Sequence, residues 1–184
     1  MDHETAPRLR TIAELNQLAP SEFAAALRPL FEAAGPLAEA LHAERPFVSY
    51  PDLLDRAESV AGRLAATAQI EVVSAHPRIG ESADAVRQTS ALSYREQGYA
   101  DEAALPSDEV RHVYAALAQL NQAYEERFGF RFVVFVNGRP KAELVKVLEE
   151  RLRNAPEIEL RAALQAMFLI ARDRYQSLAR TASG

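Results

Sequence analysis

The feature that most limits the folds open to this chain is that only one segment reads as extended. That segment is FRFVVFVNG, residues 130–138, and its aromatic and β-branched residues are typical of a buried strand. A sheet needs further strands, and the rest of the sequence offers none. We therefore expect a single extended connection, buried between helices.

Helical periodicity dominates the remaining sequence. Between Ser107 and Phe128 apolar residues recur every three or four positions, with a good helix start at Ser107 and a stop at Gly129. Residues 157–178 keep the same spacing, which predicts a long C-terminal helix packed on the core. Shorter helices punctuated by proline are predicted within residues 20–34, 35–46, 50–66 and 139–156.

These patterns predict an all-α fold with a single compact domain of about eight or nine helices. We expect residues 1–10 to be a disordered N-terminus and residues 11–180 to form the helical domain. The loosest internal stretch is expected at residues 80–89.

Composition narrows the classes of function. The chain has 184 residues and a net charge of −5, without a block of consecutive lysines or arginines, so neither nucleic acid nor an anionic membrane surface is an expected partner. The absence of cysteine excludes disulfides, thiolate metal sites and a cysteine nucleophile, and suits a cytoplasmic protein. The longest apolar run, FVVFV, is far shorter than the roughly 20 residues of a membrane-spanning helix. We expect no membrane association.

His76 is the first candidate for chemistry. It follows the apolar stretch IEVVSA, where a helix should end, and Pro77 biases it away from helical geometry. An imidazole fixed at a helix end can face a cleft, and its ordinary pKa of about 6.5 suits proton transfer at neutral pH. The alternative is that His-Pro only stops the helix, with the ring in solvent or bonded to a carbonyl.

A second candidate is SYREQ, residues 93–97. If this segment is helical, Ser93, Glu96 and Gln97 share one side and present a hydroxyl, a carboxylate and an amide to a polar heterocycle. The alternative is a capping box, in which Ser93 caps the helix and Glu96 reaches back to its amide.

Two further features could bind a ligand. Arg174 shares a side of its helix with Ile170 and Met167, and either extends to solvent or presents its guanidinium to a carboxylate at a pocket rim. The extended segment leaves backbone groups in need of partners, which a ligand rich in ureide groups could supply, or else neighbouring helices or water. No metal site is expected, because His-x-x-x-His and His-Glu-x-x-His spacings are absent.

Four blocks occur in the order of one known family: HPRIGE, the Ser-x-x-Glu-Gln spacing, LNQAYEERFGFRFVVFVNGRPKAELVKVLEERLRN, and a terminal IARDRY. With LNQLAPSEFAAALRPLFE and ERPF near the start, the sequence resembles the 2-oxo-4-hydroxy-4-carboxy-5-ureidoimidazoline (OHCU) decarboxylase family over nearly its whole length. Each block alone is weakly specific, whereas their succession is specific.

The resemblance implies a cofactor-free carboxy-lyase, usually a homodimer, that cleaves a carbon–carbon bond in the last step from urate to (S)-allantoin. It implies that His76 and Glu96 are catalytic. The positions that match the substrate pocket are Pro77, Ser93, Gln97, the backbone from Phe132 to Val134, and Arg174.

The chain departs from the family at two points. The family often reads His-Pro-Asp-Leu-Ala-Gly where this chain has His-Pro-Arg-Ile-Gly-Glu, which leaves the role of Arg78 open, and often Arg-Gly where Asn137-Gly138 stands. Two other functions stay open from the sequence. One is a non-catalytic helical binding module, and the other is a related decarboxylase or tautomerase that acts on another ureide heterocycle.

Overall fold

The computed structural model describes residues 8–99 and 107–182. Within these residues the chain is helical and contains no strand, which confirms the all-α prediction. The helices are α1 (Ile12–Leu15), α2 (Pro20–Phe31), α3 (Gly35–Ala43), α4 (Tyr50–Arg63), α5 (Ala66–Ser74), α6 (Ala83–Thr89), α7 (Ala91–Glu96), α9 (Ser107–Phe128), α10 (Lys141–Arg151) and α11 (Pro156–Ala182).

The chain divides into two compact units. The first contains Met1–Val72 and Phe168–Gly184, and the second contains Val73–Met167. Both boundaries fall within a helix, α5 in one case and α11 in the other, so these two helices contribute to both units. Of the predicted disordered N-terminus, residues 1–7 lie outside the described residues.

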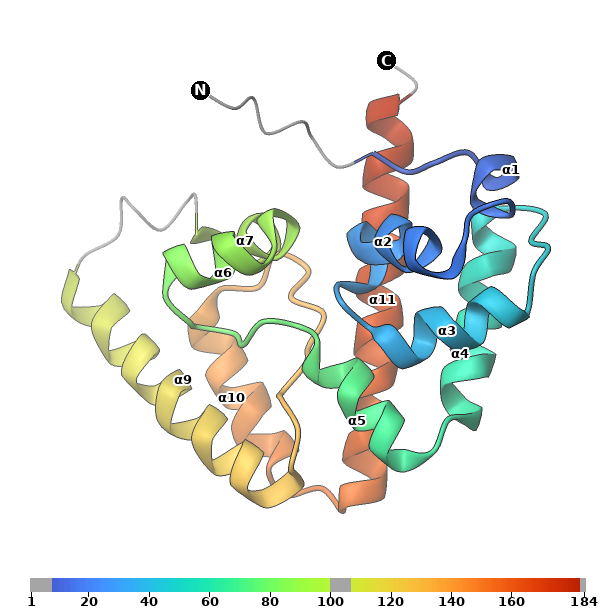
Figure 1. The fold of residues 1–184 in the computed structure, drawn as a ribbon. Coiled ribbons are helices and arrows are strands. Elements are labelled where there is room, and N and C mark those ends of the chain that lie inside the picture. The colour runs from blue at the N-terminus through green and yellow to red at the C-terminus, as the bar shows by residue number, and fades with distance from the viewer. Residues whose placement is uncertain (1–7, 100–106, 183–184) are drawn as a thin grey trace. The chain divides into compact units, whose positions relative to one another are not determined.

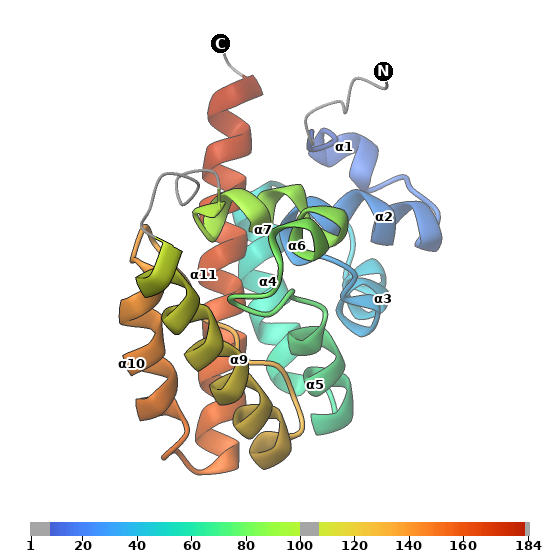
Figure 2. The ribbon, with the colours of Figure 1, turned by 90° about the vertical axis from the view of Figure 1, so that its left-hand side faces the viewer.

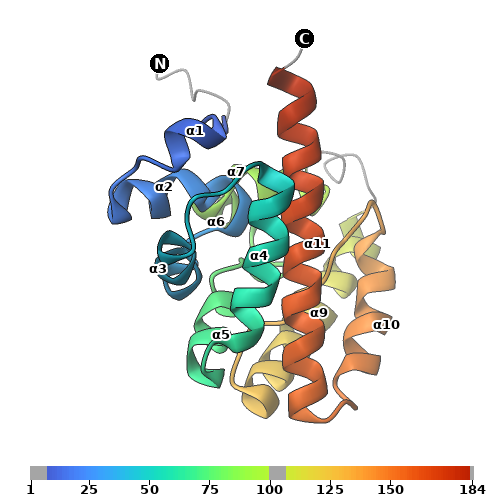
Figure 3. The ribbon, with the colours of Figure 1, turned by 90° about the vertical axis from the view of Figure 1, so that its right-hand side faces the viewer.

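In the first unit, α4 lies along the C-terminal part of α11 (Figure 3). Arg172 on α11 donates to Asp55 at 3.0 Å and to Glu58 at 2.9 Å. The rings of Tyr50 and Tyr175 stack with their centroids 5.4 Å apart. Within the first unit, Tyr175 of the predicted apolar face therefore packs on α4.

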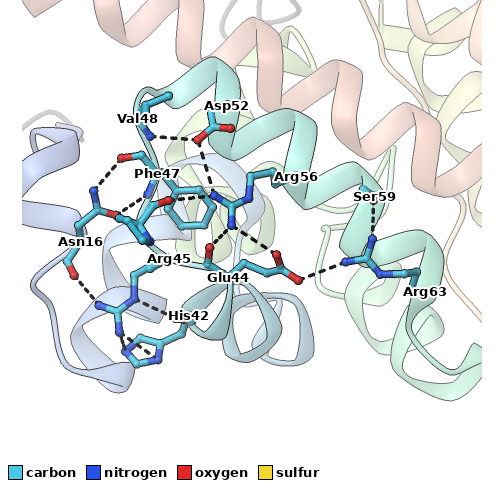
Figure 4. A network of polar contacts seen from close by, with 11 residues as sticks. Asn16, His42, Glu44, Arg45, Phe47, Val48, Asp52, Arg56, Ser59 and Arg63 are labelled. Atoms are coloured by element: carbon cyan, nitrogen blue, oxygen red, sulfur yellow. Dashed lines mark hydrogen bonds and ion pairs between the residues drawn. The ribbon is translucent and has the colours of Figure 1, made fainter.

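The connection from α3 to α4 contains the ERPF block and is fixed by a polar network (Figure 4). The Asn16 side chain pairs with both backbone groups of Phe47, at 2.8 and 2.9 Å. The Arg45 guanidinium donates to the carbonyls of Asn16, Leu18 and His42 at 2.8 to 2.9 Å. Because these partners satisfy backbone groups that no helix uses, the block is explained by structure in the first unit.

In the second unit, α9, the extended segment 131–136 and α10 follow one another. The segment runs back along α9, so α10 lies beside α9 and points in the same direction (Figures 1 and 2). The segment is neither helix nor strand, and Phe132, Val133 and Val134 are buried in it. The prediction of a buried extended connection is therefore confirmed.

The expectation of a loose stretch at residues 80–89 is wrong. Residues 83–89 form α6, and the Ser82 side chain caps it by accepting from the backbone of Ala85 at 3.3 Å. The helix packs against α7 and buries Val86 completely. Periodicity missed this helix because its short sequence carries few large apolar residues.

Among the described residues, every helix is too short or too polar to span a lipid bilayer.

Candidate active site

His76 lies in the turn that follows α5. The helix ends at Ser74, as the sequence predicted, and the backbone of His76 donates to the carbonyl of Val73 at 3.3 Å. The residue is only 4% exposed, so the alternative of an imidazole in solvent is wrong. Pro77 beside it is buried as well.

The backbone of this turn, residues 76–81, is held by side chains from distant parts of the unit. Four carbonyls accept hydrogen bonds, and each donor comes from outside the turn. The donors are Arg131 to His76 at 3.0 Å, Gln97 to Arg78 at 3.3 Å, Asn121 to Ile79 at 2.8 Å, and Tyr99 to Glu81 at 2.7 Å. Because a buried turn cannot leave its carbonyls unpaired, these donors fix the backbone that carries His76.

Gly80 is required in this turn for two reasons. Its φ of 76° lies in the left-handed region, which other residues adopt at a cost. A Cβ atom at this position would also lie 2.8 Å from Cδ1 and 3.0 Å from Cβ of Leu117, a fully buried residue of α9. The glycine therefore allows the turn to pack directly on α9.

Arg78, whose role the sequence left open, pairs with α9. Its guanidinium makes a two-pronged contact with the carboxylate of Glu125, with Nη2 to Oε2 at 2.7 Å. This hydrogen bonding lowers the pKa of Glu125 below its usual value and raises the pKa of Arg78. The Arg78 side chain thus anchors the turn to α9.

The SYREQ segment is helical, as one reading of the sequence required. Ser90 is the N-cap of α7, and its hydroxyl accepts from the backbone of Ser93 at 3.1 Å. The capping-box alternative, with Ser93 as the cap, is therefore wrong. Ser93 lies inside the helix with 3% of its surface exposed, Glu96 is the last helical residue, and Gln97 is the C-cap.

A cavity of about 510 Å³ opens beside the end of α7. Its lining includes Glu96 and Gln97, Tyr114 from α9, and Arg139 and Lys141 near the start of α10. This volume lies within the usual range for small-molecule sites. The other predicted residues of the second unit lie outside this lining: His76, Pro77, Ser93, Phe132 and Val134.

Gln97 connects α7 to the turn that carries His76. Its Nε2 donates to the Arg78 carbonyl, while its Oε1 is buried and accepts no hydrogen bond from the residues that the structure describes. A buried acceptor without a donor is costly, so this oxygen is suited to an N–H group of a ligand. The amide can thus serve the fold and a ligand at once.

Three carbonyls of the extended segment accept hydrogen bonds from side chains: Arg139 donates to Phe135 at 2.5 Å and to Val136 at 3.1 Å, and Arg151 binds Val133. Arg151 donates to the Val133 carbonyl at 3.3 Å, and its Nε donates to the buried carboxylate of Glu159 at 2.6 Å. Tyr124 also bonds Glu159, and burial, together with this bond, raises the pKa of its hydroxyl. These contacts hold the middle of the segment in place.

The neighbouring backbone groups differ. Within residues 8–99 and 107–182, the backbones of Phe132 and Val134 take part in no hydrogen bond. The prediction that neighbouring helices could satisfy the segment is therefore confirmed for Val133 and does not extend to these two residues. Their amides and carbonyls keep the capacity to bind a ligand.

Arg174 belongs to the first unit. Its side chain is 1% exposed, and its Nη1 lies 2.7 Å from Oε1 of Glu32. The alternative of an arginine that extends to solvent is thus wrong. Glu32 follows α2 with a φ of 56°, an uncommon conformation for a residue other than glycine.

Comparison with known proteins decides the family. The sequence profile of the OHCU decarboxylase family matches residues 16–176. The chain belongs to the OHCU decarboxylase family.

Individual relatives agree with this assignment. The chain is 32% identical to a uric acid degradation bifunctional protein of Bacillus sp. (strain TB-90) over 92% of its own length, and it spans 32% of that relative. It is 30% identical to the OHCU decarboxylase of Mus musculus over 83% of this chain and 84% of that one. The crystal structure of an OHCU decarboxylase in the presence of (S)-allantoin has a TM-score of 0.63, with 23% identity over 83% of this chain and 96% of that one. At this identity the structural likeness is one of fold.

For this member of the OHCU decarboxylase family, the second unit contains all but one of the residues predicted from the sequence, the exception being Arg174. The sequence did not single out the residues whose side chains hydrogen-bond the backbone around the predicted site residues. Those are Tyr99, Asn121, Arg131, Lys141 and Arg151. In the described residues, no group of three or more His, Asp or Glu side chains could hold a metal ion.

Proposed function

We propose that this chain decarboxylates OHCU to (S)-allantoin, the last step of urate degradation, as a cofactor-free carboxy-lyase. The helical domain of residues 11–180 would carry this activity. The observation that carries the proposal is the buried turn of His76, which Gln97 joins to the end of α7 and thus to Glu96, in a chain of this family.

The chemistry explains what the site must do. Loss of CO2 leaves an electron pair on the carbon that bore the carboxyl group, and in OHCU this carbon adjoins a ring C=N that can accept the pair. The protein must hold the carboxylate out of the ring plane, stabilise the enolate-like product, and deliver one proton to one face. These tasks need fixed polar groups.

We assign the acid–base task to His76, which bonds the substrate hydroxyl and transfers the proton. Its imidazole is buried on a backbone that side chains hold, which suits proton delivery to one face. Glu96, at the cavity, binds the ureido and ring N–H groups through its carboxylate.

The remaining groups orient the ring. Gln97 offers its buried Oε1 to a further N–H, and the backbones of Phe132 and Val134 offer amide and carbonyl groups to the ureide. Two buried residues complete this set: Pro77, which follows His76, and Ser93, which lies three residues before Glu96 in α7. The assignment of Arg174 to substrate binding stays a prediction of the family resemblance.

The decisive experiment is His76→Asn. General acid–base catalysis is typically worth about 10² to 10⁴ in rate, so we expect kcat to fall by that factor while the free energy of unfolding changes little. Substrate is generated from urate by urate oxidase and 5-hydroxyisourate hydrolase, and (S)-allantoin is followed by circular dichroism.

The matched control is His112→Asn, because His112 is exposed on α9 and should leave kcat unchanged. Near-normal turnover by His76→Asn would contradict the assignment. A wild-type chain that leaves the decay of OHCU unchanged would contradict the proposed function itself.

We also propose that the chain is a cytoplasmic homodimer, as the family resemblance implies. Sedimentation equilibrium tests the assembly, and a mass equal to one chain would contradict it. Fractionation of the source cells tests the location.

A further inference from the structure

Lys141 is a buried lysine that the proposed reaction does not use. The chain contains only two lysines, Lys141 and Lys146, both in α10. Lys146 is exposed, as lysines usually are, whereas Lys141 is only 5% exposed. Burying an ammonium group is costly unless partners replace the lost water, so its contacts are informative.

The ammonium group contacts the end of α7. Its Nζ donates to the Gln97 carbonyl at 2.5 Å. Gln97 is the C-cap of α7 and directly follows Glu96. Carbonyls at a helix end lack partners within the helix, and a charged donor makes a stronger bond to them than a neutral one.

Two tyrosines surround the same ammonium group. Nζ lies 3.9 Å from the ring centroid of Tyr99 and 5.5 Å from that of Tyr114. Both distances allow cation–π attraction, which is strongest where water is excluded. The rings therefore keep the ammonium group in place beside the Gln97 carbonyl.

The position of Lys141 in the chain places it beside the cavity. It is the first residue of α10 and follows the turn at Asn137 and Gly138 by three residues. Lys141, Glu96 and Gln97 all line the cavity of about 510 Å³. Because Lys141 bonds the Gln97 carbonyl, a shift of this lysine would move Glu96 and Gln97 at the cavity.

We propose that Lys141 is a positioning residue that holds the end of α7 so that Glu96 and Gln97 meet the substrate in productive geometry. This inference rests on the proposed function for its catalytic consequence. Its structural part is that the ammonium group restrains the end of α7, and this part can be tested whether or not the chain catalyses the reaction.

The kinetic test compares Lys141→Met with Lys146→Met, which makes the same change on the same helix at an exposed position. Because small misplacements of substrate-binding groups cost large factors in rate, we expect Lys141→Met to lower kcat by at least about tenfold. KM should change less than twofold, and Lys146→Met should match the wild type. Lys141→Arg retains a cation, and we expect it to recover at least a third of the wild-type kcat.

The structural test is hydrogen exchange at the amides of Gln97 and Gly98, which bond the carbonyls of Ser93 and Arg95 at the end of α7. We expect exchange to be at least about tenfold faster in Lys141→Met and unchanged in Lys146→Met. This measurement needs no turnover, so an inactive wild-type chain would overturn the proposed function while leaving this test in force.

The proposal is overturned if Lys141→Met keeps its kcat within twofold of Lys146→Met, or if exchange at Gln97 and Gly98 is unchanged. If Lys141→Met does not fold, Tyr114→Leu replaces it, because this change removes one ring from the ammonium group and leaves the lysine. We then expect about threefold faster exchange and a similar loss of kcat. If Tyr114→Leu has the wild-type kcat and the wild-type exchange rates at Gln97 and Gly98, the proposal is also overturned.

Discussion

The turn at residues 76–81 and the extended segment at residues 131–136 are both non-helical and largely buried, yet they treat their backbone groups differently. Four carbonyls of the turn accept side-chain donors from elsewhere in the unit. In the segment Arg151 and Arg139 bind the carbonyls of Val133, Phe135 and Val136. The backbones of Phe132 and Val134 make no hydrogen bond to the described residues. Side chains therefore hold the turn in place, whereas Phe132 and Val134 in the segment have backbone groups that we propose bind the substrate.

Energetics explain why the two regions can differ. A buried polar group without a partner costs about 1–3 kcal/mol, so a fold of modest stability carries few of them. The turn avoids this cost because it must hold the imidazole of His76. In the segment the cost is offset if, as we propose, a ureide substrate brings matching N–H and C=O groups, and the unpaired groups then become a source of specificity.

The largest effect in the comparison is expected from Gly80→Ala set against Gly138→Ala. Both glycines have a left-handed φ, 76° and 71°, but only Gly80 has a side chain where Cβ would go. The shared strain costs about 1 kcal/mol, and the clash with Leu117 adds about 1–3 kcal/mol for Gly80→Ala alone. For a chain of this length the difference corresponds to a Tm lower by roughly 2–12 °C.

Thermal unfolding by circular dichroism measures this difference. Equal losses of Tm in the two variants would show that the turn has room to move away from α9. The contrast between a turn that is fixed against α9 and a segment with two residues that make no backbone hydrogen bond to the described residues would then be lost.

A smaller effect is expected from Asn121→Leu, which removes one of the four donors. Asn121 is 4% exposed, and its Nδ2 bonds the Ile79 carbonyl at 2.8 Å. The variant leaves that carbonyl buried and unpaired, so we expect a loss of about 1–3 kcal/mol in the free energy of unfolding, measured with urea.

Gln122→Leu is the control, because Gln122 is the next residue of α9 and is exposed. It should change stability by less than about 0.5 kcal/mol. If the two variants cost the same, the side-chain donors do not fix the turn, and Asn121 serves only as part of the helix surface.

The long helices could be predicted because their signals are local and repeated. In α9 the start at Ser107, the stop at Gly129 and the apolar spacing between them all agree, and the helix has these bounds. The same holds for the buried extended segment, whose composition differs from everything around it. Local agreement of this kind needs no knowledge of the tertiary structure.

Two local features could not be predicted in the same way. Ser90 and Ser93 stand three residues apart and each could cap a helix, and the choice falls on Ser90 because α6 ends directly before it. The sequence of α6 itself is too polar and too short for periodicity to reveal.

The side chains that donate to the turn could not be predicted from the sequence for a different reason. The donors to the turn come from Arg131, Asn121 and Tyr99, which are 55, 42 and 18 residues from the carbonyls they bind. Arginine, asparagine and tyrosine at these places read as ordinary helix or loop residues. Only the packing of the unit brings them to the turn, so spacing along the chain carries no sign of them.

The smallest effect is expected where the turn meets α9 through a side chain. Arg78 pairs with Glu125, and the two side chains are 39% and 25% exposed, so solvent screens the pair. Glu125→Gln should therefore lower the free energy of unfolding by only about 0.5–1 kcal/mol at pH 7.

The pair lowers the pKa of Glu125. Its stabilisation is therefore complete above the unfolded pKa of about 4.3 and is lost as the pH falls through the folded pKa. Urea unfolding should therefore show wild type and Glu125→Gln converging as the pH falls below about 4.3, while Glu126→Gln, at the exposed neighbour, differs little from wild type over the same range. A gap that persists at the lowest pH at which both proteins stay folded would mean that the side chain of residue 125 acts through packing and not through its charge. The side chains that donate to the carbonyls of the turn would then be its only polar anchors among the described residues.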